Sequence, residues 1–269
     1  MSKNNNCSTS ELLAMAPKEF RAIVRRGEYT GLTVGVCRGY AMANLAIIPK
    51  KYAFDFLLFC NRNPRPCPVL DVTDPGSPHP PLLAPEADLR TDLARYRVYK
   101  DGELVSEPTE ITEFWRDDLV AFLLGCGGSF DWILQAANIH YRLIGIYKTS
   151  MRCHLAGRFN GPMVVSCRLI KGSLDAIRAI QTSSRHIMMH GPLVHIGDPL
   201  TIGIKDLYKP DVFFHKPIIS QASDEIAMFW GCGVTPQAIA VEAKLPLMIT
   251  HYPFHMFVTD RLSEELALI

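Results

Sequence analysis

The sequence has little net charge and no long apolar run. Its 28 basic residues nearly balance 27 acidic ones, which gives a formal net charge of +1. A nearly neutral chain has no long-range field that would draw it to nucleic acid or to an anionic membrane surface. Its longest apolar stretches, such as residues 119–124, are far shorter than the roughly 20 residues that cross a bilayer. We therefore expect no nucleic-acid partner and no membrane partner.

Motifs for the common cofactors are also missing. Neither GxGxxG nor GxxxxGK[ST] occurs, so nothing in the sequence supports a bound nucleotide. The eight cysteines form no C-x-x-C pair, and we expect reduced thiols. The first six residues are polar and lack the apolar core of a secretory signal. These features predict a cytoplasmic protein without a cofactor, although a divalent cation is left open.

The chain is rich enough in apolar residues, at 48%, to bury a substantial core. A strand, a glycine-rich turn and a helix follow one another twice, with helices expected near 131–137 and 236–243 after strands 119–124 and 226–230. A further apolar run at 247–250 completes a strand–helix–strand order. That order is typical of a parallel sheet with covered faces. We predict an α/β fold with a mixed, largely parallel sheet and helices on both faces.

A strand at 161–169 and a helix at 173–182 predict a smaller inserted lobe of α+β, two-layer type. We assign residues 1–135 and 216–269 to a discontinuous main domain and residues 136–215 to this lobe. Outside it we expect an opening helical region capped by Ser10 and split by Pro17, a helix at 52–60, and a hairpin around Asp101-Gly102.

Two histidines near the C-terminus are candidates for proton transfer. His251 and His255 are four residues apart, but Pro253 disfavours the helix that would align them for zinc, so no metal site is predicted. Either histidine can act as a general acid or base, with Asp260 as an orienting carboxylate. A packed, hydrogen-bonded loop explains the same residues without function.

A second candidate segment contains His195 and Asp198 between turn-forming residues. Such a loop is stiff enough to aim side chains at a substrate. Asp198 before Pro199 also suits an ordinary turn, and this alternative stays open.

The two glycine-rich turns carry Cys126 and Cys232 directly before a helix. Amides at a helix N-terminus lower a thiol pKa and bind anions, so either cysteine is a conceivable nucleophile, although a small buried residue in a tight turn is the ordinary interpretation. Thr235 is expected to cap the second helix, with Pro236 in its first turn. Four arginines are candidate carboxylate clamps or plain surface residues: Arg62, Arg65, Arg158 and Arg168.

Several blocks of the sequence, taken together, resemble the D-glutamate cyclase family, whose bacterial members are labelled hydro-lyases. The blocks are Arg38-Gly39-Tyr40-Ala41 with Asn44-Leu45, Cys60 with Arg62-Asn63-Pro64 and Cys67-Pro68, Arg95 to Tyr99, Ala156-Gly157-Arg158-Phe159 with Gly161 to Ser166, His195 to Pro199, Cys232 to Gln237, and His255 to Asp260. The sequence departs from the family pattern at three places: Gly127 to Asp131, where we expect Ser-Phe-Ser-Phe-Glu, Tyr147 to Ser150, where we expect Tyr-Arg-Thr-Asn, and Tyr252-Pro253-Phe254, where we expect Ala-Pro-Gly.

The resemblance implies an α/β fold with a smaller second lobe and the conversion of D-glutamate to 5-oxo-D-proline with loss of water. For this reaction we predict His255 or His251 as proton shuttle, and Arg62 and Arg158 as carboxylate clamps beside Asn63. The amides of Gly233 and Val234, next to Thr235, would stabilise an oxyanion. Cys232 as a transient acyl carrier is the bolder variant.

Two other functions remain open at this point. One is a lyase that dehydrates another hydroxy or amino acid, and the other is a non-catalytic binding protein for an acidic metabolite, because a fold does not fix a function. In each case the expected partner is a small acidic molecule, and a homo-oligomer is compatible with the sequence.

Overall fold

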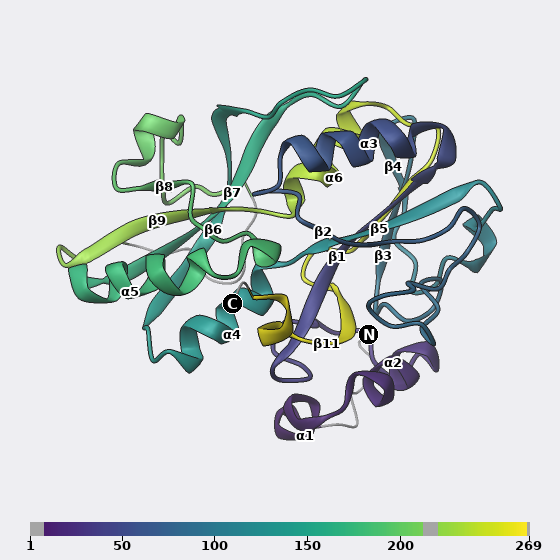
Figure 1. The fold of residues 1–269 in the computed structure, drawn as a ribbon, viewed down its shortest axis with the longest axis horizontal. Helices are drawn as coiled ribbons and strands as arrows, with labels where there is room; N and C mark the ends of the chain where they lie inside the picture. Colours follow the sequence, from purple (N-terminus) through teal and green to yellow (C-terminus); the bar gives the residue numbers. More distant parts are fainter. Residues whose placement is uncertain (1–7, 212–219, 268–269) are drawn as a thin grey trace.

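The computed structural model describes residues 8–211 and 220–267. Residues 1–6, expected as a polar start, and the expected domain boundary at 215/216 lie outside these ranges. Strands form two sheets that lie next to each other, as Figure 1 shows. No helix within the described ranges combines the length and the apolar character that a membrane crossing needs.

The first sheet has the strand order β2-β5-β1-β10-β3-β4, and β11 pairs with one end of β1. Every pairing in it is antiparallel. The strands are β1 (Tyr40–Pro49), β2 (Val69–Val72), β3 (Tyr96–Lys100), β4 (Glu103–Ser106), β5 (Leu119–Gly125), β10 (Met248–His251) and β11 (Phe257–Leu262).

The second sheet has the order β6-β7-β9-β8 and is also antiparallel throughout. Its strands are β6 (Tyr141–Arg152), β7 (Pro162–Lys171), β8 (His195–Ile196) and β9 (Glu225–Gly231). Because β9 pairs with β7 over its whole length, residues 225–231 belong to this sheet and not to the first one. The division of the chain into a main domain and a smaller lobe otherwise stays a prediction.

The expected parallel sheet was wrong, and the connections explain why. The helix after β5 leads from the first sheet into β6 of the second, and the helix after β9 leads back into β10 of the first. A helical crossover enforces parallel strands only when both strands lie in the same sheet. The strand–helix–strand order was therefore present, but it links two antiparallel sheets.

Among the described residues, six α-helices cover the sheets, and Figure 1 shows where they lie. Those at the first sheet are α1 (Thr9–Ala14), α2 (Pro17–Arg25), α3 (Lys50–Arg62) and α6 (Val234–Glu242), and those at the second are α4 (Gly127–Ala136) and α5 (Gly172–Ser184). Short 3-10 turns, η1 (Thr112–Phe114), η2 (Ile187–Met189), η3 (Pro199–Ile202) and η4 (Ser263–Leu266), complete the elements.

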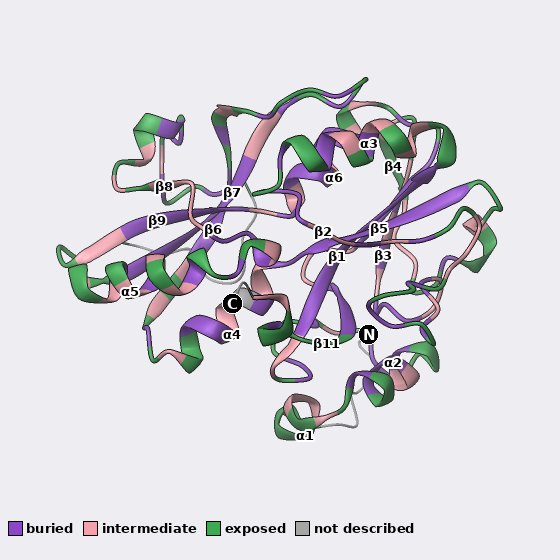
Figure 2. Ribbon diagram, viewed as in Figure 1, coloured by how far each residue is buried: buried purple, intermediate pink, exposed green. Residues whose placement is uncertain are grey.

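Both faces of the first sheet are buried. One apolar cluster joins Phe56 and Phe59 of α3 to Ile239 of α6 across strands β1 and β5. In the opposite cluster, Leu83 and Leu89 from the segment between β2 and β3 pack against the sheet, so this segment is an ordered cover. Figure 2 shows the result: β1 and β5 are buried along their length, while the outer sides of the helices are exposed.

The residues that cap the helices differ from those predicted, although the helices themselves are present. Pro17 does divide the opening region, where it begins α2, but the cap of α1 is Ser8 rather than Ser10. Helix α6 begins after Gly233, and Thr235 does not cap it. The Thr235 hydroxyl instead accepts the Val164 amide at 2.9 Å and donates to the Val164 carbonyl, which ties α6 to β7.

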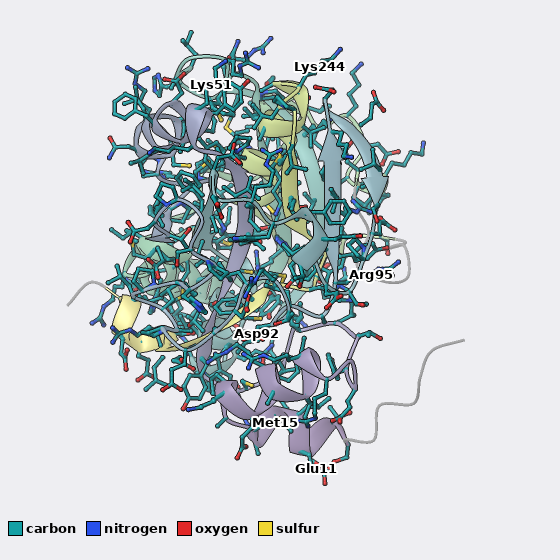
Figure 3. All side chains as sticks on the ribbon, turned by 90° about the vertical axis from the view of Figure 1, so that its right-hand side faces the viewer. Glu11, Met15, Lys51, Asp92, Arg95 and Lys244 are labelled. Carbon is teal, nitrogen blue, oxygen red and sulfur yellow. The ribbon has the colours of Figure 1, made fainter. Side chains whose placement is uncertain are left out.

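Lys51 at the start of α3 and Lys244 just after α6 lie at the same end of the molecule, and Glu11 and Met15 of the α1 region lie at the other (Figure 3).

Candidate active site

A cavity of about 480 Å³ lies where β5 and β9 run into α4 and α6. Both sheets contribute to its wall, β1 and β10 from the first and β6, β7 and β9 from the second. The polar residues that matter most in this wall are Asn44, Ser166, Arg168, His190, Gln237 and His251. The cavity is thus assembled from segments that are far apart in the sequence.

Two helices direct their N-termini at this cavity. Cys126 and Gly127 at the start of α4, and Cys232 and Gly233 at the start of α6, all line it. Cys126 caps α4 through its sulfur, which accepts the Gly128 amide at 3.3 Å. Because the N-terminal end of a helix carries partial positive charge and unbonded amides, this pair of helix starts favours an anionic ligand.

A close contact joins the two turns. The Asn44 side chain of β1 donates from Nδ2 to the Gly125 carbonyl at 2.6 Å. A Cβ atom at Gly233 would stand only 1.9 Å from that Nδ2. Glycine is therefore required at position 233 by the approach of Asn44, although its backbone φ of −64° is ordinary.

A buried ion pair forms part of the wall. Arg168 of β7 donates from Nε to Asp131 of α4 at 2.7 Å and from Nη1 to the Ser166 hydroxyl at 3.0 Å. Only 2% of the Arg168 surface is exposed, and its guanidinium lies 5.2 Å from the centre of the Trp230 ring. Burial raises the pKa of Asp131, and the Arg168 charge opposes that shift. The pair fixes a cation beside both helix starts.

The two turn cysteines are poorly activated as nucleophiles. Burial raises the pKa of Cys126 to about 12 and that of Cys232 to about 11, and hydrogen bonds from helix amides only partly offset this. At neutral pH both side chains are thiols. A thiolate is the reactive form, so the geometry places sulfur in the wall without making it reactive.

His251, at the end of β10, is one of the two C-terminal histidines and lines the cavity. Its Nδ1 atom accepts the Leu45 amide at 3.1 Å and lies 2.9 Å from the Gln237 side-chain nitrogen. Burial, followed by the nearby His255 and Arg97, lowers the pKa of His251 to about 3. The imidazole is therefore neutral at physiological pH.

His255 is placed differently. It does not line the cavity, and its Nδ1 and Nε2 atoms face the carbonyls of Pro253 and Thr30, at 2.7 and 3.3 Å. Asp260, expected to orient one of these histidines, instead forms a bidentate ion pair with Arg21 of α2 at 2.8 and 3.0 Å. Both residues hold the N-terminal helices and their loop in place.

The His195 segment also lies away from the cavity wall. His195 Nε2 lies 2.8 Å from the Asp198 carbonyl, and its ring packs 5.6 Å from that of Phe229. The Asp198 carboxylate accepts the Leu200 amide at 2.9 Å and caps η3. The arrangement matches the turn interpretation of Asp198 and Pro199.

Two of the expected carboxylate clamps, Arg62 and Arg158, do not line the cavity. Arg62 donates to the Leu155 carbonyl at 2.5 Å, and Arg158 donates to the Ala243 carbonyl while its guanidinium lies 4.7 Å over the Tyr52 ring. The Asn63 side chain donates to the His154 carbonyl and accepts the His154 amide, each at 2.8 Å. These residues brace α3 against the loop that follows β6.

The sequence assigned no role in the site to His190, Asn44 or Gln237, although Asn44 and Gln237 lie in the blocks that resemble the family. His190 has a left-handed backbone, with φ of 71°, and its Nδ1 lies 2.9 Å from the Arg65 carbonyl. Its buried Nε2 has no hydrogen-bond partner in the described ranges, and burial lowers its pKa to about 4. Arg168, named from the sequence as a candidate carboxylate clamp, does line the cavity, and with Ser166 it puts two polar side chains on one face of an otherwise apolar strand.

The family can now be assigned from sequence comparison. The profile of the D-glutamate cyclase family matches residues 120–260, which include both turns, Arg168 and His251. This chain belongs to the D-glutamate cyclase family. Groups of three or more His, Cys, Asp or Glu side chains arranged to hold a metal ion do not occur among its described residues.

Relatives named "Putative hydro-lyase" match nearly the whole chain. One from Geobacillus kaustophilus is 51% identical over 95% of this chain and 98% of its own length. Others from Rubrobacter xylanophilus and Bacillus subtilis are 52% and 49% identical, over 92% and 95% of this chain and 96% and 100% of their own lengths. Among solved structures, a nitrogen repressor-like protein from Methanococcus jannaschii aligns over 87% of this chain and 91% of its own, with a TM-score of 0.39 and 11% identity.

Proposed function

We propose that this member of the D-glutamate cyclase family is a hydro-lyase that cyclises D-glutamate to 5-oxo-D-proline with loss of water. The observation that carries the proposal is the cavity in which two helix N-termini and a buried arginine meet, inside the region that matches the family profile. Such a site suits a small substrate with two carboxylates.

The reaction is an internal amide formation, and its protons balance within the substrate and the site. The α-ammonium loses two protons, its nitrogen bonds to the carbon of the γ-carboxyl group, and one oxygen of that group takes up two protons and leaves as water. Holding the amine against the γ-carboxyl supplies much of the rate, because the attack becomes unimolecular in a fixed geometry. A closed site also has to stabilise the negative charge that develops on the remaining oxygen.

The amides of Gly233 and Val234, at the start of α6, are the proposed donors to that oxyanion. Lys148 of β6 and Arg97 of β3 also line the cavity, one from each sheet, and are the proposed partners of the α-carboxylate. They replace Arg62 and Arg158 in this role because those two side chains bond backbone carbonyls elsewhere. Of the two C-terminal histidines, His251 is the one that can touch a substrate in the cavity.

Direct attack by the substrate amine is preferred over a covalent route through Cys232. An acyl-enzyme needs a thiolate, and a pKa of about 11 leaves the Cys232 side chain protonated at neutral pH. Loss of all turnover in Cys232→Ala, with a trapped acyl intermediate in the native protein, would instead favour the covalent route.

The proposed function is tested by incubating the purified protein with D-glutamate and, separately, with L-glutamate, and by following 5-oxoproline. We expect product from the D enantiomer. Product from another hydroxy or amino acid alone would indicate a different hydro-lyase. Saturable binding of glutamate without product would indicate a binding protein for an acidic metabolite.

A further inference from the structure

The hydrogen bonds around His251 fix which of its ring nitrogens carries the proton. The Leu45 backbone N–H can only donate, and it points at Nδ1 from 3.1 Å. The Gln237 side chain approaches the same Nδ1 at 2.9 Å through its Nε2 atom. A nitrogen that accepts from an N–H group cannot itself carry a proton, so the neutral ring carries its proton on Nε2.

The orientation of the Gln237 amide is itself determined. The same Nε2 atom donates to the Leu45 carbonyl at 3.3 Å, and an amide oxygen placed there would meet another oxygen. Leu45 of β1 thus holds both partners, with its N–H on the imidazole and its carbonyl on the Gln237 amide. Helix α6, strand β1 and strand β10 together set one tautomer.

The other side of the ring is left for a ligand. His251 lines the cavity, and within residues 8–211 and 220–267 its Nε2 atom has no protein partner. The charged and titratable groups that act on the ring are Arg97 of β3 and His255 after β10. Both disfavour a second proton on the imidazole, as does burial. The ring is a neutral N–H donor directed at the site of the proposed reaction.

We propose that His251 is a fixed hydrogen-bond donor to the γ-carboxyl oxygen of the substrate, not a proton shuttle, and that Gln237 is a positioning residue that reinforces the tautomer favoured by the Leu45 amide. The inference rests on the proposed function for the identity of the acceptor oxygen. The Nε2–H group adds to the helix amides as charge develops on that oxygen, and it stays on the histidine throughout the reaction.

The tautomer is measured without substrate, by NMR of protein labelled with 15N at its nine histidines, with His251 assigned from the spectrum of His251→Gln. We expect the Nε2–H pattern for His251, unchanged from pH 8 to pH 5. An Nδ1–H pattern, or titration within this range, would overturn the inference.

Kinetic variants test the role. His251→Leu should lower kcat by about 10²–10³-fold, the usual effect of losing one oxyanion donor. His251→Gln, which cannot shuttle protons but keeps an N–H near the Nε2 position, should recover about tenfold of that loss. A glutamine variant as inactive as the leucine variant, together with a pH limb of kcat that both variants abolish, would assign His251 as a shuttle.

Gln237 is tested by a matched pair. Gln237→Glu replaces the donor at Nδ1 by a charged acceptor that competes with the Leu45 amide for this nitrogen. We expect the carboxylate to draw a proton to Nδ1, as an Nδ1–H or doubly protonated ring, with a fall in kcat comparable to that of His251→Leu. Gln237→Leu removes the donor but leaves the Leu45 amide, so the Nε2–H pattern should persist. Equal tautomers in both variants would refute the role of Gln237. If the native protein shows the Nε2–H pattern but converts no D-glutamate, the proposed function fails and the tautomer assignment stands.

Discussion

Replacing Gly233 by alanine tests the contact that brings the two helix starts together. The added Cβ would lie 1.9 Å from Nδ2 and 2.5 Å from Cγ of Asn44, so Asn44 has to move. Overpacking of this kind costs about 1–3 kcal/mol. Movement of Asn44 also removes the 2.6 Å bond to the Gly125 carbonyl, and a stranded buried carbonyl costs about 1–3 kcal/mol more. The free energy of unfolding should fall by about 2–6 kcal/mol.

The assay is urea unfolding, with the corresponding glycine of the first turn as control. A Cβ at Gly127 would meet nothing closer than 3.6 Å, so Gly127→Ala should change the free energy of unfolding by less than about 1 kcal/mol. The double variant Asn44→Ala/Gly233→Ala removes the clashing amide and should be more stable than the sum of the single effects predicts. Equal stability of Gly233→Ala and the native protein, or strict additivity in the double variant, would refute the close approach.

Three further predictions concern the buried polar groups of the cavity wall. Asp131→Asn removes the carboxylate that pairs with the buried Arg168, so the free energy of unfolding, measured in urea, should fall by about 3–5 kcal/mol. A loss under about 1 kcal/mol would mean that other groups balance the Arg168 charge. Cys232 should react with iodoacetamide at pH 7.5 about two orders of magnitude more slowly than a free thiol, because burial raises its pKa to about 11, and rapid alkylation followed by mass spectrometry would contradict this. Stability should be full above pH 6.5 and fall as the pH drops towards 4, since the folded pKa values of His190 and His251 are lowered to about 4 and about 3 and the unfolded chain binds more protons in that window. The loss at pH 5 should approach about 2 kcal/mol per histidine, and a His190→Gln variant that keeps the full pH dependence would exclude the contribution of His190.

The sequence by itself determined the local elements and the family. Apolar periodicity located strands β5, β7 and β9, and the glycine-rich turns after β5 and β9 were recognised because glycine, cysteine and a helix start follow each strand within a few residues. Blocks such as Cys232 to Gln237 identified the family because they are specific in combination. Each of these signals lies within one short segment, so it can be recognised from the sequence without knowing which segments meet in the fold.

Tertiary structure decided the sheet type and the members of the cavity wall. The sheets are antiparallel because each linking helix joins one sheet to the other, and hydrophobic patterning does not record which sheet receives the next strand. His251 and His255 look alike in sequence, yet the first meets the Leu45 amide and the second meets two carbonyls. A histidine takes its tautomer from donors and acceptors that only folding brings next to it, and at His251 those come from β1 and α6.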